Sequence, residues 1–86
     1  MEKIELENGC YKEIEYYGDK KIKIFCEYYF NSNFDVHRLD GPAEIWYREN
    51  GEIESEDYFI NDIKYSKEEF DKKINIERNL KLLNKV

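Results

Sequence analysis

His37 is the only histidine of this 86-residue chain, and it lies close to two carboxylates, Asp35 and Asp40. An imidazole oriented by a carboxylate is the core of many general bases, so this segment is the first place to look for catalysis. However, a histidine that leads into an Asp-Gly-Pro turn more often bonds to the backbone of the loop. We therefore expect a structural role for His37 and predict that the protein is not an enzyme.

The two cysteines, Cys10 and Cys26, are the other candidates for chemistry. Neither lies in a local signature of a cysteine nucleophile. One histidine with two distant cysteines also lacks the paired spacing of a metal site, and the chain has no glycine-rich phosphate loop. The sequence accordingly predicts no catalytic residue, no metal and no cofactor.

The charge of the chain indicates which partners to expect. Asp and Glu number 20 against 14 Lys and Arg, which gives a formal net charge of -6. Nucleic-acid binding depends on basic side chains that release counterions from phosphates, so we expect no direct contact with DNA or RNA. A negative surface instead attracts basic proteins, including the surfaces with which other proteins hold nucleic acid.

The distribution of apolar residues indicates where the protein is found. No apolar run is long enough to cross a bilayer, and the first residues, Met1–Glu5, lack the apolar core of a signal peptide. We therefore expect a cytoplasmic protein without membrane contact, in which both cysteines stay reduced.

Turn signals separate segments that are rich in Ile, Tyr and Phe, which is typical of a β-meander. These signals are Asn8-Gly9, Gly18-Asp19, Asp40-Gly41, Asn50-Gly51 and Asn61-Asp62. The predicted strands cover residues 3–7, 10–17, 20–30, 42–48 and 52–60, with a short strand at 63–65. The polar segment 31–35 is the expected long loop.

The pattern changes after Tyr65, where Ser66 and Glu69 fit a capping box that satisfies backbone N–H groups at a helix start. Apolar residues then recur at helical spacing: Phe70, Ile74, Ile76, Leu80 and Leu83. We expect their face to cover the sheet; the alternative is a homodimer seam formed by Leu80, Leu82 and Leu83. The predicted fold is thus α+β, a single domain over 1–86, with five to six antiparallel strands in 1–65 and one helix in 66–86.

The hairpin at Asn50-Gly51 decides which side chains of its two strands point outward. A three-residue loop over 49–51 places Tyr47 opposite Ile53, whereas a two-residue turn would place the glutamates on the aliphatic face. We favour the three-residue loop. The inward residues are then Ala43, Ile45, Tyr47, Ile53, Ser55 and Phe59. The outward residues, which we predict to bind a protein, are Glu44, Trp46, Arg48, Glu52, Glu54, Glu56 and Tyr58.

Two alternatives concern the facing of side chains. The helix or another strand could cover Trp46, in which case the glutamates form an ordinary solvated face. In the first hairpin, a three-residue loop would bury Ile4, Leu6, Cys10, Ile14 and Tyr16, whereas alignment with the later hairpin predicts the opposite facing for its second strand.

The segment His37-Arg38-Leu39-Asp40-Gly41-Pro42-Ala43, followed by Ile45-Trp46-Tyr47, Asn50-Gly51 and Tyr58-Phe59-Ile60-Asn61, resembles a MORN-like repeat. The resemblance implies hairpins that contact other proteins and supplies no catalytic residues. Small acidic proteins of this kind also resemble phage inhibitors of bacterial defence, including anti-CRISPR proteins, and antitoxin-like partners. We therefore expect a non-enzymatic module that binds a basic protein, for example a nucleic-acid-binding host protein. The alternative is a structural protein whose open sheet edges pair between copies.

Overall fold

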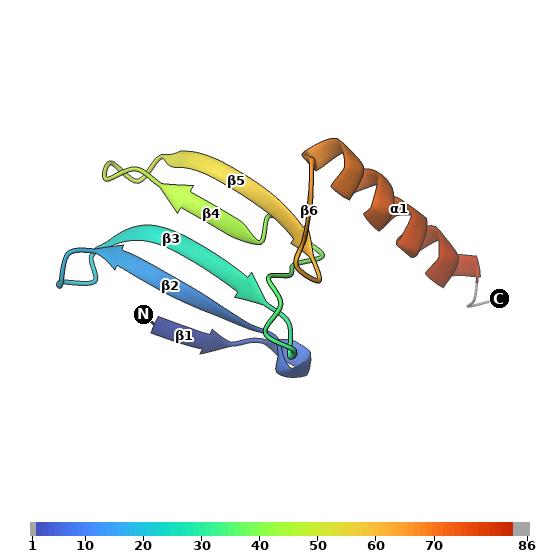
Figure 1. Cartoon of the computed structure of the whole chain (residues 1–86), viewed down its shortest axis with the longest axis horizontal. Coiled ribbons are helices and arrows are strands. Elements are labelled where there is room, and N and C mark those ends of the chain that lie inside the picture. Colours follow the sequence, from blue (N-terminus) through green and yellow to red (C-terminus); the bar gives the residue numbers. More distant parts are fainter. Residues whose placement is uncertain (1, 84–86) are drawn as a thin grey trace.

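The computed structural model describes the backbone of residues 2–83 and the side chains of residues 2–76. Over this range six strands form one antiparallel sheet in sequence order, and one helix follows them (Figure 1). The elements are β1 (Glu2–Glu5), a 3-10 turn η1 (Glu7–Gly9), β2 (Tyr11–Tyr17), β3 (Lys23–Phe30), β4 (Glu44–Tyr47), β5 (Ile53–Ile60), β6 (Ile63–Tyr65) and α1 (Lys67–Leu83). The predicted α+β meander with a single C-terminal helix is confirmed.

The tight turns form where asparagine and glycine tolerate the left-handed backbone region. Asn8 has φ 59° and Gly9 has φ 77° in the turn between β1 and β2. Between β4 and β5, the N–H of Gly51 donates to the carbonyl of Arg48 at 2.9 Å, and Gly51 has φ 88°. The N–H of Arg48 in turn donates to the carbonyl of Glu52 at 2.8 Å. The predicted three-residue loop of this hairpin is therefore confirmed.

Two β-bulges decide which side chains share a face of the sheet. In β5, Ile53 pairs with Tyr47, but Ser55 pairs with Trp46, so Glu54 is an extra residue between the two pairs. In β3, Ile24 pairs with Tyr16 and Cys26 with Glu15, so Phe25 is extra in the same way. A bulge shifts the alternation of side chains beyond it by one residue, and this shift was not predicted from the sequence.

The bulge in β5 corrects the predicted facing of that strand. Ser55 lies on the same face as Trp46, whereas Glu56 is paired with Ile45 and lies on the other face. The alternation then carries Tyr58 to the face of Ile45, and Phe59 to the opposite one. The predicted inward facing of Ser55 and Phe59 is therefore wrong, as is the placement of Glu56 and Tyr58 with Trp46.

Only some of the residues that were predicted to be buried in the first hairpin are buried. Ile14 of β2 is buried, whereas Leu6 is 43% exposed because it lies in the turn beyond the last pair of β1 and β2. Ile53, which was predicted to face inward, is likewise 51% exposed at the start of β5, where the helix does not reach. Burial is thus weakest at the ends of the hairpins.

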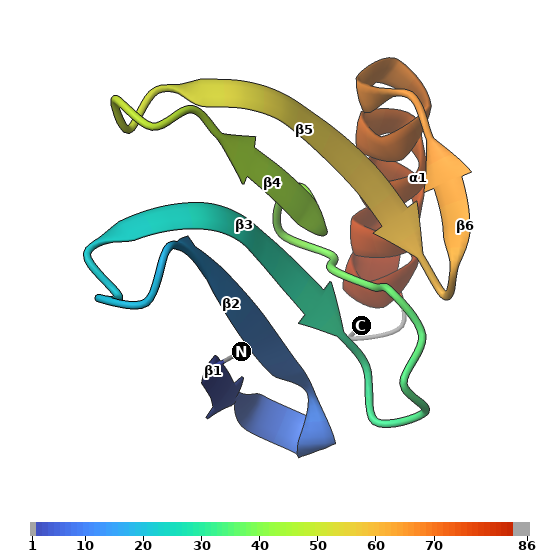
Figure 2. The same ribbon diagram turned by 60° about the vertical axis from the view of Figure 1, so that its left-hand side comes forward.

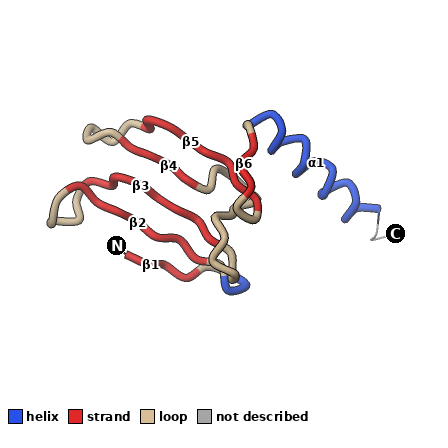
Figure 3. The backbone as a smooth tube through the Cα atoms, in the orientation of Figure 1, coloured by secondary structure: helices blue, strands red, loops and turns tan. Residues whose placement is uncertain are grey.

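The long loop between β3 and β4 is fastened to the turn that follows β5. The N–H of Asp62 donates to the carbonyl of Val36 at 2.9 Å, and the N–H of Val36 donates to Oδ1 of Asp62 at 2.6 Å. The side-chain amide of Asn31 donates to Oδ1 of Asn61 at 3.0 Å. Figure 3 shows this loop in tan beside the turn between β5 and β6.

Helix α1 begins with the predicted capping box. The N–H of Glu69 donates to the hydroxyl of Ser66 at 3.1 Å, and the N–H of Ser66 donates to Oε1 of Glu69 at 3.1 Å. These bonds satisfy backbone donors that an uncapped helix leaves without partners.

The helix covers only the C-terminal end of the sheet. Phe70 and Ile74 form a buried cluster with Ile60 of β5, and the ring of Phe70 lies 4.9 Å from that of Tyr58. Figure 2 shows α1 behind the end of β5 and beside β6, away from β1 and β2. Ile76 is 60% exposed, so its predicted place in the packing face is wrong, because the helix has left the sheet at that point. The side chains of Leu80, Leu82 and Leu83 lie outside the described residues.

Replacement of Phe70 by Ala should lower the free energy of unfolding by about 3 kcal/mol, since it removes a ring that is 4% exposed from a small cluster. The matched control is Ile76→Ala on the same helix, which should change stability by less than about 0.5 kcal/mol. Urea unfolding followed by circular dichroism measures both values. Equal losses in the two variants would show that α1 does not pack through Phe70.

Candidate protein-binding surface

The His37 side chain fastens a turn. Its Nδ1 atom accepts a hydrogen bond of 3.0 Å from the N–H of Asn61, and the backbone N–H of His37 donates to the carbonyl of Tyr29 at 2.9 Å. The lone pair on Nδ1 is thus engaged, and a neutral ring then carries its proton on Nε2. The predicted bond between His37 and loop backbone is confirmed, whereas the absence of an enzymatic activity stays a prediction.

Arg38 is held between an aromatic ring and a carboxylate. Its guanidinium carbon lies 4.1 Å from the ring centroid of Tyr29, and its Nε atom donates to Oδ1 of Asp40 at 2.9 Å. Nη1 donates to the carbonyl of Pro42 at 3.1 Å. A Cβ atom at Gly41 would lie 3.0 Å from the guanidinium carbon, so the glycine leaves space for the arginine.

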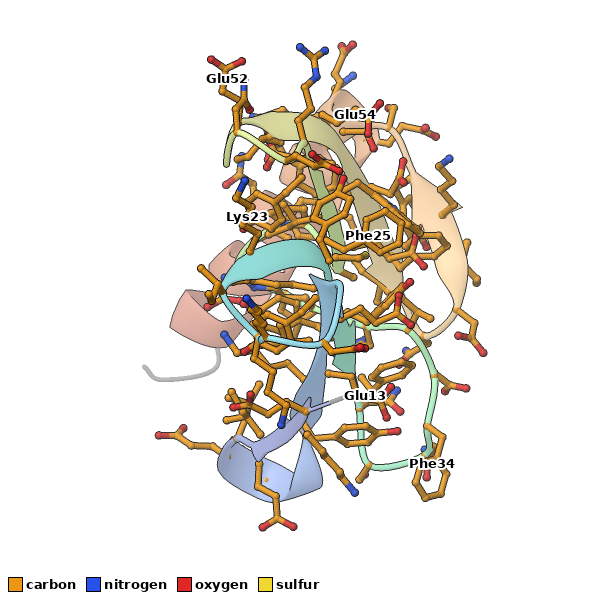
Figure 4. All side chains as sticks on the ribbon, turned by 90° about the vertical axis from the view of Figure 1, so that its left-hand side faces the viewer. Glu13, Lys23, Phe25, Phe34, Glu52 and Glu54 are labelled. Carbon is orange, nitrogen blue, oxygen red and sulfur yellow. The ribbon has the colours of Figure 1, made fainter. Side chains whose placement is uncertain are left out.

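The face of the sheet that points away from α1 carries a continuous row of rings, which we call the aromatic face. Its members are Tyr11, Tyr17, Phe25, Tyr28, Phe30 and Trp46. Successive centroids lie 5.0 Å apart for Tyr17 and Phe25, 5.3 Å for Phe25 and Trp46, and 5.8 Å for Trp46 and Tyr28. These three contacts are edge-to-face, which aromatic pairs favour. Figure 4 shows Phe25 and Glu13 on the same side of the sheet.

Trp46 is half-buried, and only side chains of the sheet itself shield it. Its indole packs against Phe25 and Tyr28 from the neighbouring strand, on the face opposite to α1. Of the two possibilities in that alternative, cover by the helix is wrong, whereas side chains of the neighbouring strand β3 do shield the indole in part. Beneath these rings Cys26 is fully buried, and burial raises the pKa of its thiol to about 11.

Carboxylates lie among these rings in two rows that run across the strands. One row is Glu15, Cys26, Trp46 and Ser55, and the next is Glu13, Tyr28, Glu44 and Asp57. Burial raises the pKa of the Glu44 carboxyl, and the negative charge of Asp57 raises it further.

Few cations of the protein itself reach this group of carboxylates. Nζ of Lys64, on β6, lies 3.3 Å from Oδ1 of Asp57 and forms an ion pair at that end of the row. Among the described residues, Glu15 and Glu44 take part in no ion pair. The hydroxyl of Tyr28 lies 3.5 Å from Oε2 of Glu15. The aromatic face therefore holds negative charge that the fold leaves unneutralised.

The residues that the sequence proposed for binding fall into three places. Glu44 and Trp46 lie on the aromatic face, and Glu54 is the extra residue of the bulge beside them. Arg48 and Glu52 lie at the tip of the hairpin, where Figure 4 shows Glu52 far from Glu13. The two others, Glu56 and Tyr58, lie on the face that α1 covers in part, and Tyr58 contacts the helix.

The sequence did not identify the contribution of β2 and β3 to this surface. Glu13 and Glu15 alternate with other residues along β2, which is a visible signal for one face of a strand. Phe25 and Tyr28 reach the face together only because the bulge in β3 turns Phe25 toward Trp46. A bulge depends on the pairing of two strands, so the pattern of one strand does not reveal it.

Comparisons with protein-family models, with curated proteins and with solved structures found no match. The resemblance to MORN-like repeats stays a prediction. No helix within the described residues is long and apolar enough to cross a membrane. The same residues contain no group of three or more His, Cys, Asp or Glu side chains that could hold a metal ion.

Replacement of Glu44 by Gln should stabilise the protein at pH 7 by less than about 1 kcal/mol. The pKa of Glu44 is raised because the folded state disfavours the ionised carboxyl, so ionisation of Glu44 destabilises the folded protein. This loss of stability appears as the pH rises through the folded-state pKa. Below the unfolded-state pKa the carboxyl is protonated in both states, and the gain should disappear. Thermal unfolding at pH 7 and pH 3 measures both effects.

Glu52→Gln, at the exposed tip of the hairpin, is the matched control and should leave stability unchanged at pH 7. A Glu44→Gln variant that is less stable than the wild type at pH 7 would show that the carboxylate supports the fold.

Proposed function

We propose that the protein is a non-enzymatic binding module whose aromatic face docks on a basic surface of a partner protein. The observation that carries this proposal is the row of large rings around Trp46, which no helix or strand of the described residues covers and which carboxylates border. Tyr and Trp dominate the binding energy of protein interfaces when they are surrounded by groups that exclude water. Carboxylates at the rim would select a basic partner.

The charges on this face favour the same proposal. Glu44 and Asp57 are paired across β4 and β5, where like charges weaken the sheet. Among the described residues, Lys64 is the one cation that forms an ion pair with either carboxylate, and its side chain is 64% exposed. A cationic partner would remove the repulsion on binding, so a feature that is unfavourable for folding becomes favourable for association.

The sharpest form of the proposal is a phage-type inhibitor of a bacterial defence protein, as anti-CRISPR proteins are. The chain is acidic overall, with a formal charge of -6, and its carboxylates would compete with phosphates for a groove that holds nucleic acid. An antitoxin-like partner would use the same surface and the same physical attraction. Both forms assume a cytoplasmic protein.

Self-assembly is the second candidate, because the sheet has two open edges. Within the described residues, β1 has a neighbour on one side only, and β6 pairs with residues 58–60 of β5, so no strand pairs with the outer edge of residues 53–57. Both edges are acidic: Glu2 and Glu5 lie on β1, and Glu54 and Glu56 lie on β5. Like charges on two edges oppose their pairing, which is a known protection against sheet growth. This favours the binding module.

Replacement of two carboxylates on the aromatic face by lysine should abolish the capture of basic proteins. In the variant Glu15→Lys/Glu44→Lys both changes lie beside Trp46, whereas the control Glu52→Lys/Glu56→Lys changes the net charge equally on exposed positions away from that face. Tagged wild type and control should recover the same basic proteins from bacterial lysate at low salt, and the first variant should lose them. Mass spectrometry identifies the proteins, and circular dichroism checks the fold.

Equal recovery by all three proteins would contradict a role for the aromatic face. Loss in both variants would assign the attraction to net charge alone and would equally contradict the proposal.

The protein should stay monomeric as its concentration rises, because both open edges carry negative charge. Multi-angle light scattering over a concentration series at about 0.15 M salt measures the molar mass, and a constant value near 10.6 kDa is expected. A mass that grows steadily with concentration would favour the self-assembling alternative.

A further inference from the structure

We propose that the aromatic face seats one arginine side chain of the partner over Trp46, between the carboxylates of Glu15 and Glu44. This inference rests on the proposed function and specifies the group that the surface recognises.

The protein places its own cations over the tyrosine rings of its sheet. Nζ of Lys3 lies 4.4 Å from the ring centroid of Tyr11, and Nζ of Lys73 lies 5.8 Å from that of Tyr65. Tyr29 has the guanidinium of Arg38 at 4.1 Å. A cation over the face of a ring is attracted by the ring quadrupole. Cations of the chain therefore lie over three of its tyrosine rings, Tyr11, Tyr29 and Tyr65.

The group around Trp46 is different. Among the described residues, no lysine or arginine lies over the rings of Phe25, Tyr28 or Trp46. Indole is the aromatic group that attracts cations most strongly, so Trp46 offers the most favourable ring of this group to a cation from a partner. Trp46 lies on the uncovered face of the sheet and is half-buried, so part of the indole stays open to a partner.

Glu15 and Glu44 border Trp46 from two directions. Glu15 lies in the same row across the sheet, with Cys26 as the residue between them, and Glu44 lies two residues before Trp46 on the same face of β4. Strands are about 4.8 Å apart, which places the Cα of Glu15 roughly 10 Å from that of Trp46. A guanidinium over the indole therefore lies within reach of both carboxylates, since each glutamate side chain is flexible.

Arginine suits this surface better than lysine. Its planar guanidinium stacks on a ring while its edge donates several hydrogen bonds to carboxylates, whereas an ammonium is a compact and strongly hydrated charge. Arg38 already uses both contacts in this chain, with Tyr29 as the ring and Asp40 as the carboxylate. The surface at Trp46 offers the same ring and carboxylate chemistry without an arginine of its own.

Trp46 is the only tryptophan, so its fluorescence reports directly on this surface. Three acetylated and amidated pentapeptides of glycine would be titrated at low salt, with arginine, lysine or citrulline as the central residue. Citrulline keeps the shape of arginine and removes its charge. The arginine peptide should bind the full-length wild type about tenfold more tightly than the citrulline peptide, and more tightly than the lysine peptide.

The preference for arginine over citrulline should fall several-fold in Glu15→Gln/Glu44→Gln and should be unchanged in the control Glu56→Gln, on the other face of the sheet. Circular dichroism would confirm that each variant is folded. Equal binding of the three peptides, no fluorescence change with any of them, or a preference that survives Glu15→Gln/Glu44→Gln would overturn the inference. The proposed function would still stand in those cases if the wild type captured basic proteins and the variant Glu15→Lys/Glu44→Lys did not.

Discussion

The structure depends on one constraint: a single-layer sheet has to shield its apolar surface with its own side chains. Helix α1 covers only the end of β5 and β6, where Phe70 and Ile74 meet Ile60. Over β2, β3 and β4 the shielding comes from rings that lie against one another, with Cys26 fully buried beneath them. Such rings cannot all be removed from water, because no helix or strand of the described residues packs above them. The same side chains therefore stabilise the fold and form a surface that can bind a partner.

The two bulges turn this constraint into a specific site. The bulge in β3 brings Phe25 to the same face as Cys26, and the bulge in β5 separates Glu56 from Trp46. Without the bulge in β3, strict alternation would place Phe25 on the opposite face from Cys26 and Tyr28. Without the bulge in β5, Glu56 and Tyr58 would lie on the same face as Trp46. The result is one face with rings and carboxylates and another that accepts the helix. The two bulges thus determine which carboxylates lie on the aromatic face, where they can contact a partner.

Local signals in the sequence predicted the meander, the three-residue loop at Gly51 and the capping box at Ser66. Each of these depends on a few adjacent residues, such as a glycine with positive φ or a serine three residues before a glutamate. The aromatic row was not predicted, because it joins Tyr17, Phe25 and Trp46 from three strands and needs a bulge to do so. The facing of Tyr58 was wrong for the same reason.

The central claim is that the aromatic face, rather than net charge in general, receives a basic partner. Nuclear magnetic resonance of the ¹⁵N-labelled protein, titrated with a short arginine-rich peptide, tests it most directly. The account predicts that the indole N–H of Trp46 and the amides of Glu15, Cys26 and Tyr28 shift first and most, while those of α1 stay unchanged. Shifts of equal size over both faces, or shifts confined to the hairpin tips and the helix, would contradict it.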